Sequence, residues 1–283
     1  MIVLPGFGAP AGALEWPVSE KAIVLNFGAN EEGSPVLGTV FEYEGAVNAA
    51  GPGDLLFECP ADGGMSGLPS PLGRWTALDH GDGIVSVYCR LAPSAPEAPP
   101  GDAPLVGSAG SSGWSEAPGF CFFLFDRKER RWCNPAMMMS PSEEDTQMPS
   151  IIETRLSSPS APASGGILPA AARPTVIRQG TYLVSVTASD RSSAGRTLAP
   201  YCIVCMVNGK EEGRSLTFET FTARAGVLMT YRSGFVPASQ VYRSFPGFEV
   251  GEVLLTRGHT SLDIIVSDFA GNTRSIVYSL TVE

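Results

Sequence analysis

The chain has 283 residues, which is long enough for two domains that each bury a hydrophobic core. Hydrophobic residues make up 43% of it and charged residues 17%, a balance that excludes an intrinsically disordered chain. The net charge of -10 argues against nucleic acid as a partner, because that affinity comes mainly from Lys and Arg side chains that neutralise phosphates.

No apolar stretch reaches the roughly 18 to 20 residues that cross a bilayer, so we expect no membrane span. Residues 1–15 lack the basic start and the long apolar centre of a secretory signal. We therefore expect either a cytosolic protein or an exported one whose leader has been removed.

Short runs rich in Val, Ile, Tyr and Phe alternate with turn-forming clusters in the first half and predict a mostly β structure. The predicted strand segments are 22–28, 46–58, 74–91 and 119–135. In the last of them, the apolar run GFCFFLF is followed by the charged turn DRKERR, which predicts one arm of a buried hairpin. Cys121 and Cys133 flank this hairpin and could face each other.

Ser, Pro, Ala and Gly dominate from about Ser140 to Arg173 and indicate a linker, within which SIIETRL can still pair as a first strand. Period-two alternation follows in two segments and predicts a sheet that is packed on one face. The inward positions are Tyr182, Val184, Val186 and Ala188 in the first segment, and Ile276, Tyr278, Leu280 and Val282 in the second. With a terminal hairpin turn at SDFAGN, this pattern predicts an immunoglobulin-like β-sandwich.

Histidine limits the chemistry, because the chain has only His80 and His259. A zinc site within either half would have one histidine at most. We expect His80 to hydrogen-bond its own glycine-rich turn and His259 to lie in an exposed turn. The carboxylate pairs Glu42 with Glu44 and Asp79 with Asp82 are expected on solvated faces.

Six cysteines leave the redox compartment open. Cys202 and Cys205 have the C-x-x-C spacing of redox and zinc sites, but they lie in a predicted strand, where the two side chains point to opposite faces. We expect core thiols here. The types and spacing of these residues do not predict an active site.

Four segments nevertheless follow one another in an order that resembles that of a known protein family. They are WPVSEKAIVLNFGANEEGSPVLGTVFE, GAVNAAGPGDLLFE, LGRWTALDHGDGIVSVYCRL and VGSAGSSGWSEAPGFCFFLFDRKERRWCNP. Their order over residues 16–135 resembles the lysostaphin-type or LytM-like zinc endopeptidases, which cut peptidoglycan cross-bridges. The alternative is that GFCFFLF is a core strand of an unrelated β protein.

The resemblance assigns functional positions one at a time. The family's H-x-x-x-D motif falls on VLGTV, so Val36 and Val40 stand at two zinc-ligand positions. Phe122 stands at the third ligand, Phe120 at one catalytic histidine, and Arg90 at the histidine of the family's Tyr-x-His-Leu pattern. The three ligand positions thus hold apolar side chains, so we expect no zinc, no other cofactor and no catalysis.

The resemblance implies a LytM-like antiparallel β-sheet domain over 16–139, after an N-terminal extension at 1–15. A linker at 140–173 and an immunoglobulin-like β-sandwich at 174–283 follow, as in certain bacterial cell-envelope proteins. The implied function is a pseudoenzyme of the periplasm or cell envelope that binds peptidoglycan peptide or a cell-wall hydrolase. Arg90 could hold a peptide carboxylate bidentately or make a local salt bridge. The alternatives are an active peptidase with displaced ligands and an envelope adhesin or assembly factor that binds through the β-sandwich.

Overall fold

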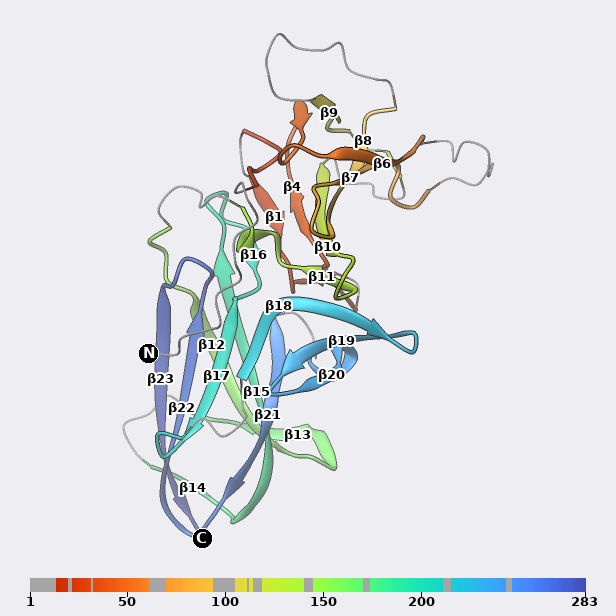
Figure 1. The fold of residues 1–283 in the computed structure, drawn as a ribbon. Coiled ribbons are helices and arrows are strands. Elements are labelled where there is room, and N and C mark those ends of the chain that lie inside the picture. The colour runs from red at the N-terminus through yellow and green to blue at the C-terminus, as the bar shows by residue number, and fades with distance from the viewer. Residues whose placement is uncertain are drawn as a thin grey trace. The chain divides into compact units, whose positions relative to one another are not determined.

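The computed structural model describes residues 14–19, 22–31, 33–61, 70–93, 105–110, 112–113, 119–139, 145–169, 174–210, 215–242 and 246–283. The chain is built almost wholly from β-strands (Figure 1). It forms two compact units, residues 1–23 with 38–142 and residues 24–37 with 143–283. The predicted all-β class is therefore confirmed. Among the described residues, no helix is long and apolar enough to cross a membrane.

The first unit contains an antiparallel sheet in the order β4, β10, β8, β7 and β6, with β11 also paired to β10 and a separate pair of β5 with β9. The strands are β4 (Thr39–Phe41), β5 (Ala46–Asn48), β6 (Asp54–Cys59), β7 (Arg74–Asp79), β8 (Ile84–Leu91), β9 (Leu105–Ser108), β10 (Phe120–Asp126) and β11 (Arg131–Cys133). A 3-10 helix, η2 (Pro135–Met137), follows, and β1 (Ile23–Leu25) contains the boundary between the units.

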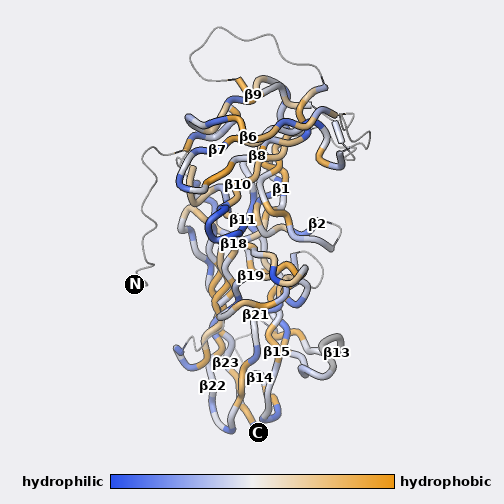
Figure 2. Tube along the Cα trace, turned by 45° about the vertical axis from the view of Figure 1, so that its right-hand side comes forward, coloured by the Kyte–Doolittle hydropathy of each residue, from blue (hydrophilic) through white to orange (hydrophobic). Residues whose placement is uncertain are grey.

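The predicted hairpin is confirmed, since β10 pairs antiparallel with β11. Its charged turn stands out in dark blue beside the β11 label in Figure 2. The expected meeting of Cys121 with Cys133 is wrong, because the register sets Leu124 opposite Cys133 and Cys121 opposite Cys89. Burial raises the pKa of the Cys133 thiol to about 11 and that of Cys89 well above its usual range, so both stay protonated at neutral pH.

The second unit contains two sheets. One runs in the order β14 (Thr175–Ile177), β23 (Thr273–Val282), β22 (Gly258–Ser267), β17 (Cys202–Val207), β18 (Ser215–Arg224), β19 (Val227–Arg232) and β20 (Phe235–Pro237). The other runs β13 (Ala161–Ile167), β12 (Ser150–Ser158), β15 (Gly180–Arg191) and β21 (Gly247–Leu255), with β16 (Thr197–Leu198) at the end of β15. The hairpin of β2 (Asn30–Glu31) with β3 (Ser34–Pro35) and the 3-10 helix η3 (Ala238–Gln240) complete the unit. β14 and β23 pair in parallel.

The two sheets pack against each other through alternating side chains. On β15, Val184, Val186 and Ala188 are buried as predicted, but Tyr182 is only half-buried, and Leu183 and Ser185 are buried as well. On β23 Tyr278 is 5% exposed while its neighbour Val277 is 65% exposed. The rings of Phe218 on β18 and Phe248 on β21 lie 5.4 Å apart and join the sheets. The predicted terminal hairpin is confirmed, with β22 and β23 side by side in dark blue in Figure 1. The immunoglobulin-like architecture stays a prediction.

Two stretches of the predicted domain layout need correction. Within 140–173, where composition indicated a linker, β12 confirms that SIIETRL pairs as a strand, whereas β13 was not predicted. β13 is made mainly of small residues with low strand propensity, so only its pairing with β12 reveals it. Segment 24–37, predicted in the first domain, packs with the second unit. There the Asn26 side chain donates to Ala199 O and accepts from Ala199 N, each at 2.8 Å. The other predicted domain limits stay a prediction.

The polar residues weighed for chemistry mostly lie on the surface, as expected. Asp79 and Asp82 form exposed ion pairs with Arg127 and Lys128. His259 is exposed but lies in strand β22 rather than in a turn, because its register places it opposite Thr281. Glu42 and Glu44 are exposed, and in the C-x-x-C pair Cys205 is fully buried while Cys202 is half-buried.

Candidate functional site

Three of the positions that the resemblance assigns to zinc and catalysis lie on the paired strands β4 and β10, but the side chain of Val40 and those of Phe120 and Phe122 point to opposite faces of the sheet. Val40 lies opposite Cys121, and Phe120 and Phe122 lie on either side along β10. Val40 is 7% exposed, and both phenylalanines are fully buried. Gly38 precedes β4, and a Cβ at this position would lie 2.3 Å from the Phe122 carbonyl oxygen. Glycine at the centre of the VLGTV motif is therefore required by the close approach of two backbones.

The two phenylalanines are part of an aromatic cluster. The ring of Phe122 lies 5.4 Å from Tyr88 and 6.5 Å from Trp16, between centroids. Phe120 lies 6.3 Å from Tyr88 and 5.9 Å from Phe41. None of these rings offers a lone pair of the kind that zinc accepts from His, Cys or carboxylate side chains. The side chains at these positions therefore do not fit a zinc ion.

Val36, the remaining ligand position, belongs to the segment that packs with the second unit. Its N–H donates to Ala29 O at 2.7 Å, and its carbonyl accepts from Gly28 N at 3.0 Å. Val36 is 8% exposed. Its side chain is thus an apolar core residue there and offers no metal ligand.

A chain of polar contacts runs behind the aromatic cluster. The Tyr88 hydroxyl accepts from Ala50 N at 2.7 Å and lies 2.9 Å from Ser86 Oγ. Ser86 Oγ lies 2.7 Å from His80 Nε2, and Nδ1 of the same ring lies 2.8 Å from Pro52 O. Because a carbonyl oxygen only accepts, Nδ1 carries the proton in that bond. Burial raises the pKa of Tyr88, with a smaller opposing effect from its hydrogen bonds, so the phenol stays neutral.

This arrangement supports a pocket of about 400 Å³ on the first unit. It is lined by Glu15, Trp16, Asn48, Ala49, Ala50, Gly51 and Pro52. Phe122 packs behind Trp16, while Tyr88 and His80 hold the backbone of Ala50 and Pro52. Phe122 and His80 thus act as positioning residues for one wall of the pocket. The backbone N–H of His80 donates to Ile84 O at 2.9 Å within the turn, but its ring bonds Pro52 and Ser86 rather than the glycine-rich turn that was expected.

Sequence reasoning missed Trp16 and Tyr88 as site residues. Both lie in the segments that carried the resemblance, Trp16 in the Trp-Pro-Val start and Tyr88 in the Tyr-x-His-Leu pattern. That shared context was the one available signal, because neither residue has a spacing that indicates chemistry by itself. The sequence of loop 48–52 did not indicate a binding site. Its small residues line the pocket only because Tyr88 and His80 hold the loop backbone in place.

Arg90 adopts a left-handed backbone conformation with φ 61°, which costs about 1–2 kcal/mol in a residue with a Cβ. It lies in a β-bulge, because β8 places three steps between Tyr88 and Leu91 where β7 has two between Thr76 and Arg74. Among the described residues, its guanidinium has no hydrogen-bond or ion-pair partner, so the predicted local salt bridge is not found there. Arg90 does not line the pocket.

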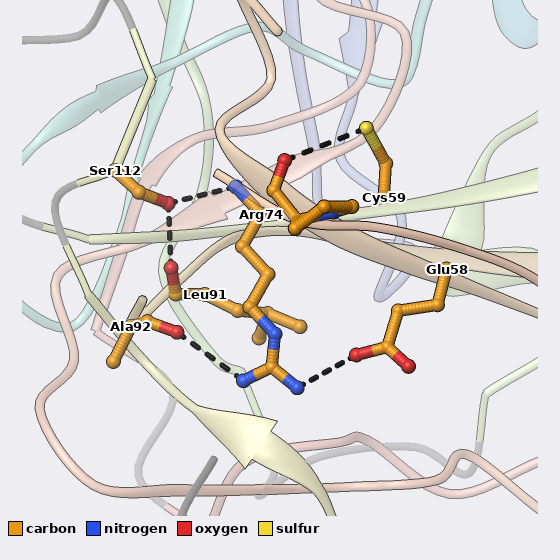
Figure 3. A network of polar contacts seen from close by, with 7 residues as sticks. Glu58, Cys59, Arg74, Leu91, Ala92 and Ser112 are labelled. Atoms are coloured by element: carbon orange, nitrogen blue, oxygen red, sulfur yellow. Dashed lines mark hydrogen bonds and ion pairs between the residues drawn. The ribbon is translucent and has the colours of Figure 1, made fainter. Parts of the chain in front are cut away.

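The chain directly after Arg90 is held by the network in Figure 3. Arg74 donates from Nη1 to Ala92 O at 3.2 Å and from Nη2 to Glu58 Oε1 at 2.8 Å. The Arg74 N–H donates to Ser112 Oγ at 3.0 Å, and Ser112 in turn donates to Leu91 O. These bonds fix the backbone of β7 at Arg74 and of β8 at Leu91, and therefore also the bulge that contains Arg90.

Replacing Arg74 with alanine should lower the free energy of unfolding by about 1–3 kcal/mol, because its guanidinium loses part-buried hydrogen bonds to Ala92 O and Glu58. Arg127→Ala is the matched control. Its ion pair with Asp79 is half exposed, so its effect should stay within about 0.5 kcal/mol. Urea unfolding of both variants measures the difference, and equal losses would contradict the buried role of Arg74.

Comparison with solved structures finds peptidases. A zinc-containing peptidase from Vibrio cholerae is 17% identical with a TM-score of 0.35, and the match covers 46% of this chain and 40% of that one. A mutant catalytic domain of the prophage-encoded M23 protein EnpA from Enterococcus faecalis is 21% identical with a TM-score of 0.33, over 43% of this chain and 94% of that one. Lysostaphin from Staphylococcus simulans, an antimicrobial peptidase, is 14% identical with a TM-score of 0.29, over 89% of this chain and 87% of that one.

This chain therefore spans less than half the length of the Vibrio cholerae peptidase. A protein-family model matches residues 163–283. No curated protein matches the sequence. At these identities and TM-scores, the case for a function rests on the residues of this chain.

Proposed function

We propose that the first unit is a LytM-like domain that does not hydrolyse its ligand and works by binding peptidoglycan peptide. The observation that carries this proposal is the contact of Phe122 with Trp16 and Tyr88. At the position of a zinc ligand, this ring instead supports the wall of a pocket. Without a metal or a catalytic histidine at these positions, the chain has neither a Lewis acid nor a general base there.

The pocket has the chemistry of a recognition site. Its volume of about 400 Å³ lies in the range of small-ligand sites, and it combines an aromatic side chain with the polar side chains of Glu15 and Asn48. The Glu15 carboxylate is exposed and suits a peptide amine. Arg90 is the proposed contact for a peptide carboxylate, because its guanidinium has no hydrogen-bond or ion-pair partner among the described residues.

The resemblance supports a place in the periplasm or cell envelope, with an immunoglobulin-like second unit and no zinc cofactor. Co-sedimentation of the purified chain with isolated peptidoglycan sacculi tests the binding. We expect the intact chain to sediment with the sacculi and to release no peptide fragments. Trp16→Ala should weaken binding about tenfold, the usual effect of truncating an aromatic residue at the centre of an interface. Arg90→Ala should weaken it as well.

Trp75→Ala is the matched control, since Trp75 stacks on Phe57 at 4.8 Å and does not line the pocket. Fragment release that depends on added zinc would contradict the proposal and favour an active peptidase with displaced ligands. Unchanged binding in the Trp16 and Arg90 variants would place binding on the second unit, as in an adhesin or assembly factor. A chain that does not sediment would favour a protein partner such as a cell-wall hydrolase.

A further inference from the structure

Three carboxylates from distant parts of the sequence meet in the second unit. Asp145 precedes β12, Asp190 lies near the end of β15, and Asp268 lies in the turn between β22 and β23. One oxygen of each lies within 4.8 Å of the others. Among the described residues, no Lys, Arg or His forms an ion pair with any of the three. Their mutual repulsion is therefore not offset by a basic side chain in the part of the chain that the structure describes.

A separate observation indicates that a ligand belongs there. Asp190 is 8% exposed, and its Oδ1 atom has no hydrogen-bond partner in the described structure. The carboxylate receives a hydrogen bond from the Arg191 backbone N–H. A buried carboxylate oxygen without a donor is rare and costly in a native protein. This oxygen belongs to the carboxylate that meets Asp145 and Asp268, so its lone pairs are available to an ion that all three hold.

Asn272 fixes the carboxylate of Asp268 and the backbone of Asp145, and Gln147 N fixes the carboxylate of Asp145. Its backbone N–H donates to Asp268 Oδ1 and its Nδ2 to Asp268 Oδ2, both at 2.8 Å. The same Nδ2 donates to Asp145 O at 2.8 Å, while Asp145 Oδ1 accepts from Gln147 N at 2.9 Å. Each carboxylate oxygen has about two lone pairs, so these bonds leave room for a cation.

We propose that Asp145, Asp190 and Asp268 bind a calcium ion. All three donors are carboxylate oxygens, which are the ligands of hard cations rather than of zinc. Calcium bonds oxygen at about 2.3–2.6 Å, so oxygens on opposite sides of one ion lie up to about 5 Å apart. That span accommodates the observed separations. Asp145 is exposed, and its side of the site is open to the waters that complete a coordination sphere of six to eight oxygens.

The ion would join three segments at one end of the second unit. Asp190 belongs to one sheet, Asp268 connects two strands of the other, and Asp145 belongs to the chain that enters β12. Calcium would thus fasten the two sheets together and fix the start of this unit. From the sequence Asp268 is predicted only as a turn residue, because its partners are about 80 and 120 residues away and no spacing rule connects them.

The test uses the full chain, stripped with a chelator and then titrated with calcium chloride by calorimetry and thermal unfolding. We expect one calcium ion per chain and a melting temperature that rises by several degrees as calcium is added, since the ion binds only the folded state. Asp190→Asn keeps the shape but removes a ligand charge. We expect it to weaken calcium affinity at least about tenfold, the loss that corresponds to one good ligand interaction.

Asp263→Asn is the matched control. Asp263 on β22 also has a buried Oδ1 without a hydrogen-bond partner among the described residues, but it is not part of the carboxylate group. This variant should keep the full response to calcium. If Asp190→Asn does not fold, Asp145→Asn tests the same site at an exposed position. No heat and no change in melting temperature with calcium, a larger response to magnesium, or an equal loss in the Asp263 control would overturn the proposal.

Discussion

Phe122→Ala should lower the free energy of unfolding by about 3–5 kcal/mol, the usual cost of removing a fully buried phenyl ring. Phe122 is fully buried and packs on Tyr88 and Trp16 from the middle of the sheet. The substitution leaves a cavity among aromatic rings, whose positions are fixed by their own strands. Urea unfolding with linear extrapolation measures the loss, and sedimentation with sacculi should weaken as well because Trp16 loses its support.

Phe125→Ala provides the control on the same strand. Its ring packs on Trp132 at 4.8 Å between centroids, and Phe125 is only half-buried. The chemical change is identical, so the difference between the two variants isolates burial. We expect a clearly smaller loss for Phe125. A loss at Phe122 no larger than that at Phe125 would show that the former ligand position is not part of a packed core.

The sequence was sufficient to predict strands where apolar character is local. The run at 119–125 and the alternation around Val184 and Tyr278 each carry their own period, and the structure has strands at these places. It was insufficient wherever a partner strand decides the outcome. β13 forms only because β12 is beside it, and the register that sets Cys121 opposite Cys89 is fixed by pairing between strands, which no single segment encodes.

In the candidate site, too, some features could be predicted from the sequence and others depend on long-range packing. Resemblance placed Val40, Phe120 and Phe122 at one site, but the register of β4 with β10 puts Val40 on the same sheet face as Cys121 and the two phenylalanines on the other face. It could not place Val36, because segment 24–37 packs with the second unit through contacts of Asn26 and Phe27. The pocket around Trp16 was also hidden, since its wall depends on bonds that connect Ala50 to Tyr88, 38 residues away. Long-range packing, rather than local propensity, determines these features.

Val40→Asp would restore the residue type that the resemblance expects at this position, and we expect it to destabilise the protein by about 3–5 kcal/mol. Val40 is 7% exposed, and its cross-strand partner on β10 is Cys121, which offers no cation. An ionised carboxylate there has no partner, which is the costly case of a buried charge. Burial would raise the pKa of the new carboxyl above its unfolded value, so the loss should shrink as the pH falls through that raised pKa.

Val40→Thr is the matched control, because it has nearly the same shape and adds a hydroxyl without a charge; its loss should be about 1–3 kcal/mol. Unfolding of both variants is followed with and without added zinc. Zinc should not restore the Asp variant, since a protein zinc site takes three or four ligands and this substitution supplies one carboxylate. Stabilisation of that variant by zinc would mean that other side chains still complete a metal site, and the non-hydrolytic proposal would then have to be abandoned.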